Sequence, residues 1–354
     1  MELYEKIYVK PAFLDTEHGR IGCPECHGGD PADPDWQTAH RGLVRDPTYP
    51  NAAATCGECH EEIVSSAAAS LHYTLRPFRN TVLMRADRQD TAALAVIDHA
   101  MGRHCNSCHA SCGQCHVSRP DYVKGGFLAG HRFLKQPPMD STCAGCHGGR
   151  VHAEYTGAGD EDNADVHAVD GEMTCRDCHT AAEMHANAEG VDTRFDLPER
   201  PACTQCHPEA AEKNSGHRAH DLHQGRLACQ VCHAGPGKSC FNCHVGTDKK
   251  GLPYFKCRKT QLLFKIGLNP DKSEERPFDY VVLRHPPADR GLFDAYGKNV
   301  LARFDDLPTW KLDAPHSIQR VTPQNRSCNN CHGHGELFLT PKDVDPRELR
   351  ANRD

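Results

Sequence analysis

The sequence predicts a mostly irregular chain with short helices and little β-structure. Only 38% of its 354 residues are hydrophobic, and the mean hydropathy is −0.66. Counted with glycine and without tyrosine, about 44% of the chain is apolar, below the about 45–50% that is usual for soluble domains, and we expect too little apolar surface for two ordinary cores. Its 29 glycines and 24 prolines favour loops and turns. No run of about eighteen apolar residues occurs, which predicts no transmembrane segment in this chain.

Cysteine and histidine are unusually frequent, with 21 and 25 residues. Twenty of the cysteines form ten copies of the motif Cys-x-x-Cys-His, and only Cys257 lies outside it. In chain order the paired motif cysteines are Cys23 and Cys26, Cys56 and Cys59, Cys105 and Cys108, Cys112 and Cys115, Cys143 and Cys146, Cys175 and Cys178, Cys203 and Cys206, Cys229 and Cys232, Cys240 and Cys243, and Cys328 and Cys331. The motif histidines are His27, His60, His109, His116, His147, His179, His207, His233, His244 and His332.

This motif has a chemical reason. Two thiols one turn apart can add to the two vinyl groups of a haem, and the adjacent imidazole then binds the iron. A redox dithiol, a zinc site or a disulfide framework explains paired cysteines. None of these alternatives requires a histidine after every pair. The motifs therefore predict ten c-type haems, and a fold organised around a chain of haems.

Haem also resolves the low apolar content, because each porphyrin supplies a large apolar surface. With one haem per roughly 35 residues, the cofactors replace the core. We therefore predict that the protein does not fold without its haems, as in small domains that fold only around a metal. Two pairs of motifs are close together in the sequence: His109 and His116 are seven residues apart, and His233 and His244 are eleven apart. Porphyrins on such short tethers are expected to lie nearly in contact.

The remaining fifteen histidines include one candidate distal ligand for each haem. The motifs divide into five and five, and flanking histidines repeat with them. His99 and His223 each lie six residues before a motif, and His131 and His316 each lie twelve before one. Looser matches complete the set and leave a choice between His217 and His220. The candidate distal ligands are His18, His40, His72, His99, His131, His167, His185, His217 or His220, His223 and His316.

These repeats predict a first pentahaem half at 1–155 and a second at 156–354. A haem-free insert is expected at about 246–315, with short strands in YVVLRH and QLLFKIGL. It contains Cys257, either a buried apolar side chain or a partner in an intermolecular disulfide. Helices are expected from Asp90 to Met101, ending at Gly102, and more weakly after His60 and after His207. Other histidines, among them His104, His152, His285 and His334, are expected at the surface or on haem propionates.

The ten motifs, the paired halves and the unpaired histidines resemble multihaem c-type cytochromes of extracellular and periplasmic electron transfer. Two branches are similar: decahaem subunits of porin–cytochrome conduits, and filament-forming extracellular cytochromes. The insert favours a free or polymeric conduit. The resemblance implies redox partner proteins or an extracellular acceptor, and self-polymerisation into a filament. In a filament one distal ligand crosses between subunits, with His18 the first candidate. Scattered Lys and Arg and a net charge of −7 argue against nucleic acid.

An iron with two protein imidazoles has no open coordination position. The predicted function is therefore electron transfer along closely stacked bis-histidine haems, and the chain is expected to be an electron carrier rather than an enzyme. The alternative is a multihaem reductase of nitrogen or sulfur oxyanions with one open haem. Because thioether attachment takes place outside the cytoplasm, we expect an exported protein, extracellular or at the cell surface, or alternatively periplasmic. MELYEKIYVK lacks the pattern of a signal peptide.

Overall fold

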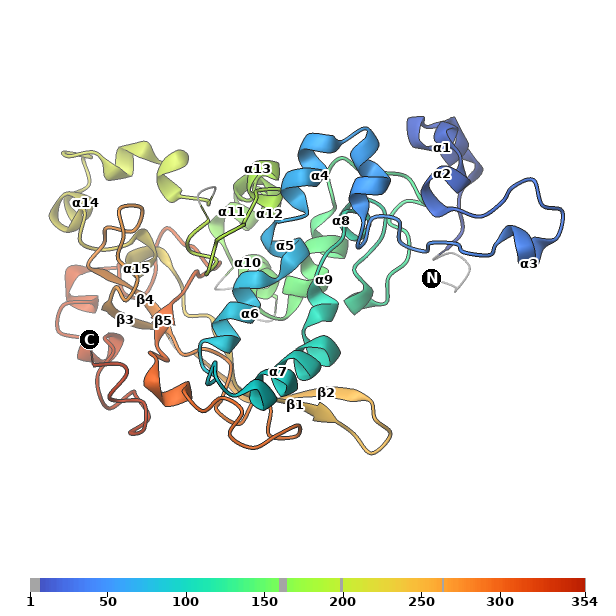
Figure 1. Cartoon of the computed structure of the whole chain (residues 1–354). Helices are drawn as coiled ribbons and strands as arrows, with labels where there is room; N and C mark the ends of the chain where they lie inside the picture. Colours follow the sequence, from blue (N-terminus) through green and yellow to red (C-terminus); the bar gives the residue numbers. More distant parts are fainter. Residues whose placement is uncertain (1–6, 159–163, 198–199, 263, 354) are drawn as a thin grey trace. The chain divides into compact units, whose positions relative to one another are not determined.

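The computed structural model describes residues 7–158, 164–197, 200–262 and 264–353 (Figure 1). The side chains of residues 107, 238–242 and 257–262 lie outside this description, and with them Cys240 and Cys257. The described chain is mostly irregular, with short helices and few strands, as predicted. None of its helices is long and apolar enough to cross a bilayer.

The helices are short and follow one another along the chain, with five strands in the last third. The α-helices are α1 Glu17–Ile21, α2 Cys23–His27, α3 Trp36–Ala39, α4 Glu61–Ala67, α5 Leu71–Thr74, α6 Arg76–Leu83, α7 Thr91–His104, α8 Cys112–His116, α9 Ala144–His147, α10 Ala153–Thr156, α11 Val166–Val169, α12 Cys175–Cys178, α13 Ala181–Met184, α14 Arg218–His223 and α15 Cys229–His233. The strands are β1 Lys238–Thr247, β2 Pro253–Leu262, β3 Lys265–Leu268, β4 Tyr280–Arg284 and β5 Lys311–Leu312.

The chain divides into two compact units, each assembled from separate stretches of sequence. The first unit comprises Met1–Arg79, Asn106–Gly148 and Cys175–Glu199, and the second comprises Asn80–Cys105, Gly149–Thr174 and Arg200–Asp354. In the second unit, β1 and β2 form an antiparallel hairpin, and β3, β4 and β5 form an antiparallel sheet with β4 in the middle. The predicted pentahaem halves were defined by the positions of the haem motifs and not by chain packing, so this division stays a prediction.

Local signals in the sequence explain which predicted helices form. Asp90 accepts a hydrogen bond from the amide of Ala93 and so caps α7, as predicted. The predicted end of this helix at Gly102 is wrong, because the helix continues to His104, which is buried with Ala100 and Met101. Burial of this face outweighs the weak helix propensity of glycine.

The other predicted elements form only in part. The segment after His60 is helical but broken into α4 and α5, because Ser70 caps the second helix. The single helix predicted after His207 is wrong: a 3-10 turn covers Pro208–Ala211 and α14 starts at Arg218. Between them Asn214 and Gly216 have positive φ, which no α-helix accommodates. The predicted strand in YVVLRH is β4, and the one in QLLFKIGL is divided between β2 and β3.

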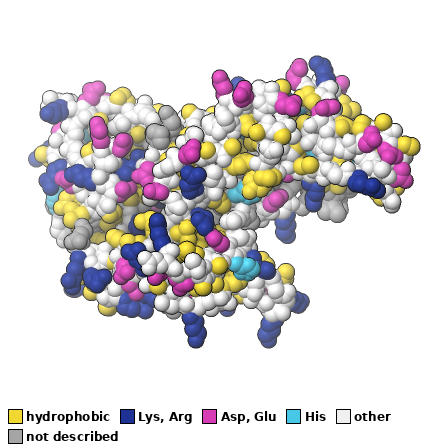
Figure 2. Space-filling model, in the orientation of Figure 1, with side chains coloured by type: hydrophobic (Ala, Val, Ile, Leu, Met, Phe, Trp, Pro, Cys, Tyr) yellow, Lys and Arg dark blue, Asp and Glu magenta, His cyan; other side chains and the backbone are white. Residues whose placement is uncertain are grey.

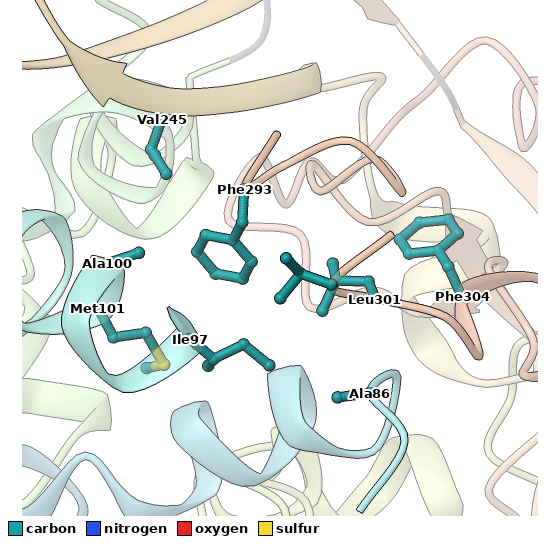
Figure 3. Packing of buried hydrophobic residues seen from close by; sticks show 9 residues of the cluster. Ala86, Ile97, Ala100, Met101, Val245, Phe293, Leu301 and Phe304 are labelled. Atoms are coloured by element: carbon teal, nitrogen blue, oxygen red, sulfur yellow. The ribbon is translucent and has the colours of Figure 1, made fainter. Parts of the chain in front are cut away.

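Two clusters of buried apolar side chains lie in the second unit, and both depend on residues 246–315. In the first cluster, Ile97 and Met101 of α7 pack with Phe293, Leu301 and other residues of the region predicted to be haem-free (Figure 3). The second cluster is built from Ala228, Val231, Ile266, Val281, Val282, Leu283, Trp310 and Val344. Apart from prolines, the described part of the first unit has only seven buried apolar side chains, namely Phe13, Ala52, Val64, Ala67, Val117, Ala188 and Leu197.

A buried carboxylate joins three segments of the second unit. Glu348 is 4% exposed, accepts a hydrogen bond of 2.7 Å from the Thr309 hydroxyl, and lies 3.1 Å from Nε2 of His285. The expectation that His285 lies at the surface is wrong, because it is buried in this network; a bond to a haem propionate stays a prediction. Burial acts to raise the pKa of Glu348, but the hydrogen bonds from His285 and Thr309 outweigh it and hold this pKa below its ordinary value.

We predict that Glu348→Ala destabilises the second unit by about 3 kcal/mol, because two buried polar groups lose their partner. The matched control is Glu336→Ala, since Glu336 forms an exposed pair with His334 and such pairs contribute little. Denaturant unfolding of the two variants measures the difference. Because the folded pKa of Glu348 is lowered, its stabilising contribution is present above the ordinary carboxyl pKa and is lost as the pH falls through the folded value. Equal stabilities for the two variants would contradict this role.

Candidate functional site

The Cys-x-x-Cys-His motifs form single tight turns. Three of them are the helices α2, α8 and α15. In four others the amide of the motif histidine donates to the carbonyl of the first cysteine, at 2.8–2.9 Å for His60, His179, His207 and His332. Such a turn brings the two thiols and the imidazole to one short stretch of surface. The ninth motif differs, because Cys243 and His244 lie in strand β1, which sequence reasoning missed.

The motif thiols differ in their exposure to solvent. In the described part of the chain none of them forms a disulfide. Those that are exposed rather than half-buried are Cys23, Cys59, Cys178, Cys203, Cys206 and Cys328.

Two of the exposed thiols are each followed by an exposed motif histidine. Cys59 and Cys206 are the second cysteines of the second and seventh motifs. Both follow 3-10 turns, Cys56–Glu58 and Cys203–Gln205, and the histidine after each is exposed as well. Among the described contacts, neither thiol meets a cysteine of another motif. These two positions are thus open to solvent, where a haem vinyl group can reach the sulfur but protein side chains do not enclose it.

Most motif imidazoles form a hydrogen bond through Nδ1, and Nε2 is then the nitrogen that can bind a metal. Nδ1 donates to a backbone carbonyl in His27 (Val44, 2.7 Å), His116 (Leu134, 2.7 Å) and His233 (Gln319, 3.1 Å). In each of these three, the amide of the acceptor residue donates back to the histidine carbonyl. His109 donates to Asn106 at 3.0 Å and His244 to Gly291 at 2.9 Å. An anchored Nδ1–H fixes the tautomer and leaves Nε2 as the nitrogen that can bind a metal.

Seven motif imidazoles face a second imidazole from outside the motifs. The pairs, with ring-centroid separations, are His27–His131 (5.9 Å), His60–His18 (6.2 Å), His116–His185 (6.1 Å), His147–His72 (6.2 Å), His207–His167 (6.1 Å), His233–His220 (6.0 Å) and His332–His223 (5.9 Å). Each pair lies within one unit and contains one motif histidine and one predicted distal histidine. The structure brings His220, not His217, to a motif histidine.

The separation within these pairs matches the space that an iron needs. A metal bound to two imidazoles has two bonds of about 2.0 Å, and each nitrogen lies about 1.1 Å from its ring centroid, which puts the centroids about 6.2 Å apart. Direct ring stacking brings centroids closer, as for His18 and Phe133 at 4.1 Å. The seven pairs therefore fit an iron with two axial histidines, and each pair adjoins the two thiols of its motif.

The electrostatics of the pairs favours neutral imidazole, which is the form that binds metal. Burial, reinforced by His147, lowers the pKa of His72 to about 4. Burial also lowers the pKa of His18, His131 and His185, and in each case the facing motif histidine lowers it further.

Several distal candidates are also anchored through Nδ1. His167 donates to the Asp165 carboxylate at 2.8 Å and His223 to the Ala219 carbonyl at 2.8 Å. His40 donates to the Trp36 carbonyl at 2.7 Å and His316 to that of Ala314 at 2.9 Å. Sequence reasoning missed the carboxylates that hold imidazoles, Asp165 and Glu183. Glu183 is four residues after His179, and its Oε2 is 2.8 Å from Nδ1, so a His-x-x-x-Glu spacing was the signal available.

Four predicted distal ligands are not placed on a motif imidazole by any described contact. His40 is exposed at the end of α3, and His99 is exposed on α7 with Tyr296 5.6 Å away. His217 lies 5.5 Å from His220. The fourth is His316. Among the motif histidines, His109 has Tyr49 edge-on at 4.3 Å, and its buried Nε2 has no hydrogen-bond partner in the described structure.

Other histidines have different roles. The expectation of a surface position is wrong for His104, which is buried and bonded through Nε2 to the Tyr296 hydroxyl at 2.7 Å; its expected bond to a haem propionate stays a prediction. His334 is exposed and pairs with Glu336 at 2.5 Å. His152 is half-buried beside α10. None of these three is paired with a motif histidine among the described contacts.

Thiols from different motifs lie close together. These contacts show which motifs are neighbours in space within each unit. Hydrogen bonds join Cys143 to Cys175, Cys108 to Cys146, and Cys203 to Cys229. Further neighbours interact electrostatically and are Cys26 with Cys56, Cys56 with Cys112, Cys115 with Cys143, and Cys232 with Cys331. In the first unit the motifs therefore run first, second, fourth, fifth, sixth, with the third beside the fifth. In the second unit the seventh, eighth and tenth are consecutive.

The described residues contain no group of three or more His, Cys, Asp or Glu side chains arranged to hold a free metal ion. Comparison with protein-family models, with curated proteins and with solved structures finds no match for this chain.

Proposed function

We propose that the protein is a c-type cytochrome that carries ten haems and conducts electrons along them to an extracellular or periplasmic acceptor. The observation that carries the proposal is the set of seven facing imidazole pairs, each spaced for an iron and each beside two motif thiols. Bound there, haem supplies one-electron redox chemistry. The chain supplies the thioether cysteines, both axial nitrogens and the hydrogen bonds that orient them.

The neighbour relations of the motif thiols support conduction rather than ten separate sites. A cysteine thioether lies at a porphyrin edge, so neighbouring thiols of two motifs bring two porphyrin edges together. In the first unit this links the second, fourth, fifth and sixth motifs in sequence. Short edge-to-edge distances permit rapid electron exchange, which is what an electron carrier requires.

The experiment uses the exported, haem-loaded protein. Intact mass and the pyridine haemochrome spectrum are expected to give ten covalently attached haems per chain. Electron paramagnetic resonance of the oxidised protein is expected to show low-spin haem, because both axial positions are filled. Covalent haem well below ten per chain, in protein matured with the haem-attachment machinery, would overturn the proposal.

One observation favours the alternative of a reductase. The motif histidine His109 has Tyr49 against its ring, and no described histidine packs on it. An iron bound by His109 without a second imidazole is open to a nitrogen or sulfur oxyanion. Carbon monoxide binding to one haem of the reduced protein, with a spectrum of the bound complex that changes in His109→Ala but not in Tyr49→Phe, would support this reading. Reduced protein whose spectrum is unchanged by carbon monoxide argues against it.

A further inference from the structure

The imidazole that faces the first motif is surrounded by phenylalanines. His131 faces His27, and the ring centroids of Phe13, Phe127 and Phe133 lie 4.6, 4.9 and 6.0 Å from that of His131. All three phenyl rings are steeply inclined to the imidazole, at interplanar angles of 72–82°. These three phenylalanines are called the aromatic cage below. The cage covers this distal imidazole with apolar surface.

The caged imidazole has no hydrogen-bond acceptor from another residue. Nδ1 of His131 is buried, and among the described residues only the backbone of His131 itself interacts with it. Acceptor and N–H within one residue cannot align well. His131 also has a positive φ of 74°, directly after Gly130 with φ 62°. Such a conformation persists for a histidine only where the surrounding structure holds it, so the cage fixes the ring at a cost in backbone strain.

Two other distal imidazoles of the first unit are influenced by carboxylates. Burial lowers the pKa of His18, and the carboxylate of Glu17 opposes this. Burial likewise lowers the pKa of His72, and the carboxylate of Glu183 opposes it. For His131, burial and His27 lower the pKa, and no carboxylate opposes them among the described interactions.

The first and fourth motifs provide a matched comparison. In both, the motif histidine donates Nδ1 to a backbone carbonyl at 2.7 Å, His27 in the first motif and His116 in the fourth. The two sites differ on the distal side. The backbone of Ala181 accepts a hydrogen bond from His185, which faces His116, whereas His131 has only its own backbone. The distal imidazole is therefore the difference between the two sites.

Both properties of the caged imidazole favour reduced iron. An acceptor on Nδ1–H makes an imidazole a more basic ligand, and a more basic ligand stabilises ferric iron. His131 lacks such an acceptor from another residue. Apolar surroundings also disfavour the net positive charge of ferric haem relative to neutral ferrous haem. Each effect raises the reduction potential of an iron bound between His27 and His131.

Acidic side chains around the first motif act in the opposite direction. Residues 15–62 contain ten Asp or Glu, three Arg and no Lys, and Figure 2 shows acidic and hydrophobic side chains together over this part of the first unit. Most of these carboxylates are exposed. Water weakens their effect on the iron, and salt screens it over about 10 Å. The cage contacts the ligand itself, so we expect its effect to be the larger one.

The first motif also lies at one end of the row of motifs in the first unit. That row runs first, second, fourth, fifth, sixth. Cys26 is half-buried and interacts with Cys56 of the second motif, whereas Cys23 is exposed. One thioether of the first motif therefore adjoins the next haem site, and the other is open to solvent.

We propose that the first haem has the highest reduction potential among the first, second, fourth and fifth haems, because the aromatic cage holds its distal imidazole without an acceptor. This rests on the proposed function, since it requires haems on these motifs. Electrons move toward higher potential. In the first unit they therefore run from the sixth motif, where Glu183 holds His179, toward the first. They leave at the thioether edge of Cys23. The cage phenylalanines are positioning residues that act through His131 and do not touch the iron.

The order of reduction is measured by a redox titration of the haem-loaded protein, followed by electron paramagnetic resonance. Four variants, His18→Ala, His72→Ala, His131→Ala and His185→Ala, each remove one component from the low-spin signal and so assign it to a haem. In the wild type, the component assigned by His131→Ala is expected to be reduced first among these four.

The cage is tested without changing a ligand. Phe127→Gln brings an amide oxygen beside His131 and is expected to shift the sharing of electrons between the first haem and the other three about tenfold toward the others, which is about 59 mV for one electron. Phe127→Leu keeps the cage apolar and is expected to leave the first haem the first to be reduced. Phe78→Gln, at a side chain that is 49% exposed in the same unit, is the control and is expected to shift no haem. Phe13→Gln with Phe13→Leu repeats the comparison if Phe127→Gln does not acquire its haems.

The outcomes separate the two proposals. Covalent haem well below ten per chain overturns the proposed function. In protein with ten haems, reduction of the His131 component after any of the other three overturns the inference and leaves the function standing. The same holds if the glutamine variant leaves the first haem unchanged, or if the leucine variant lowers its potential as far as the glutamine variant does.

Discussion

Chain produced without haem attachment is expected to lose the ordered structure of the first unit and to keep only local structure in the second. Apart from prolines, the first unit buries seven apolar side chains in its described part, three of them alanine, and contains neither apolar cluster. Burial of a large apolar side chain contributes about 1.5–3 kcal/mol, while ordering each residue costs about 1–2 kcal/mol in backbone entropy. The remaining stabilisation of the first unit must come from burial of apolar porphyrin surface.

Hydrogen exchange tests this expectation by measuring the protection of backbone amides in each segment. In haem-free protein, amides of α4, α5 and α8 are expected to exchange as in an unfolded chain. Those of α7 and β4, which pack in the two apolar clusters, are expected to retain partial protection. The haem-loaded protein is the control and is expected to protect both sets. Native-like protection of α4 and α8 without haem would contradict haem as the core of this unit.

Replacement of His72 by methionine is expected to raise the reduction potential of the single haem bound by His147. His72 faces His147 at 6.2 Å, and burial together with that histidine lowers its pKa to about 4, so it is neutral near pH 7. A methionine ligand stabilises ferrous iron relative to histidine. Potentiometric titration should therefore show one haem in ten moving to higher potential.

Two further variants test the assignment of His72. His72→Ala removes the ligand, so one haem is expected to become high-spin and to bind carbon monoxide. His334→Gln, at an exposed histidine paired with Glu336, is the control and is expected to change no haem. Ten unaltered low-spin haems in His72→Ala would show that His72 is not a ligand.

Elements and site residues could be predicted from the sequence wherever the signal that determines them is local. Asp90 predicts the start of α7 because a cap acts over three residues. The histidine repeat identified seven residues that the structure places against motif imidazoles. The sequence did not predict which motif each distal histidine faces. His131 faces His27 across 104 residues, and only tertiary contacts determine such a pairing. The β1–β2 hairpin and the buried position of His104 were missed for the same reason.

The carboxylates that hold motif or distal imidazoles are concentrated at two successive motifs. Glu183 binds His179 of the sixth motif, and Asp165 binds His167, which faces His207 of the seventh. Elsewhere the anchors are mainly neutral backbone carbonyls. A carboxylate makes an imidazole more basic and stabilises ferric iron. With haem bound, these two haems are therefore expected to have the lowest reduction potentials in the protein, and under the proposed function their reduction limits the rate of electron transfer.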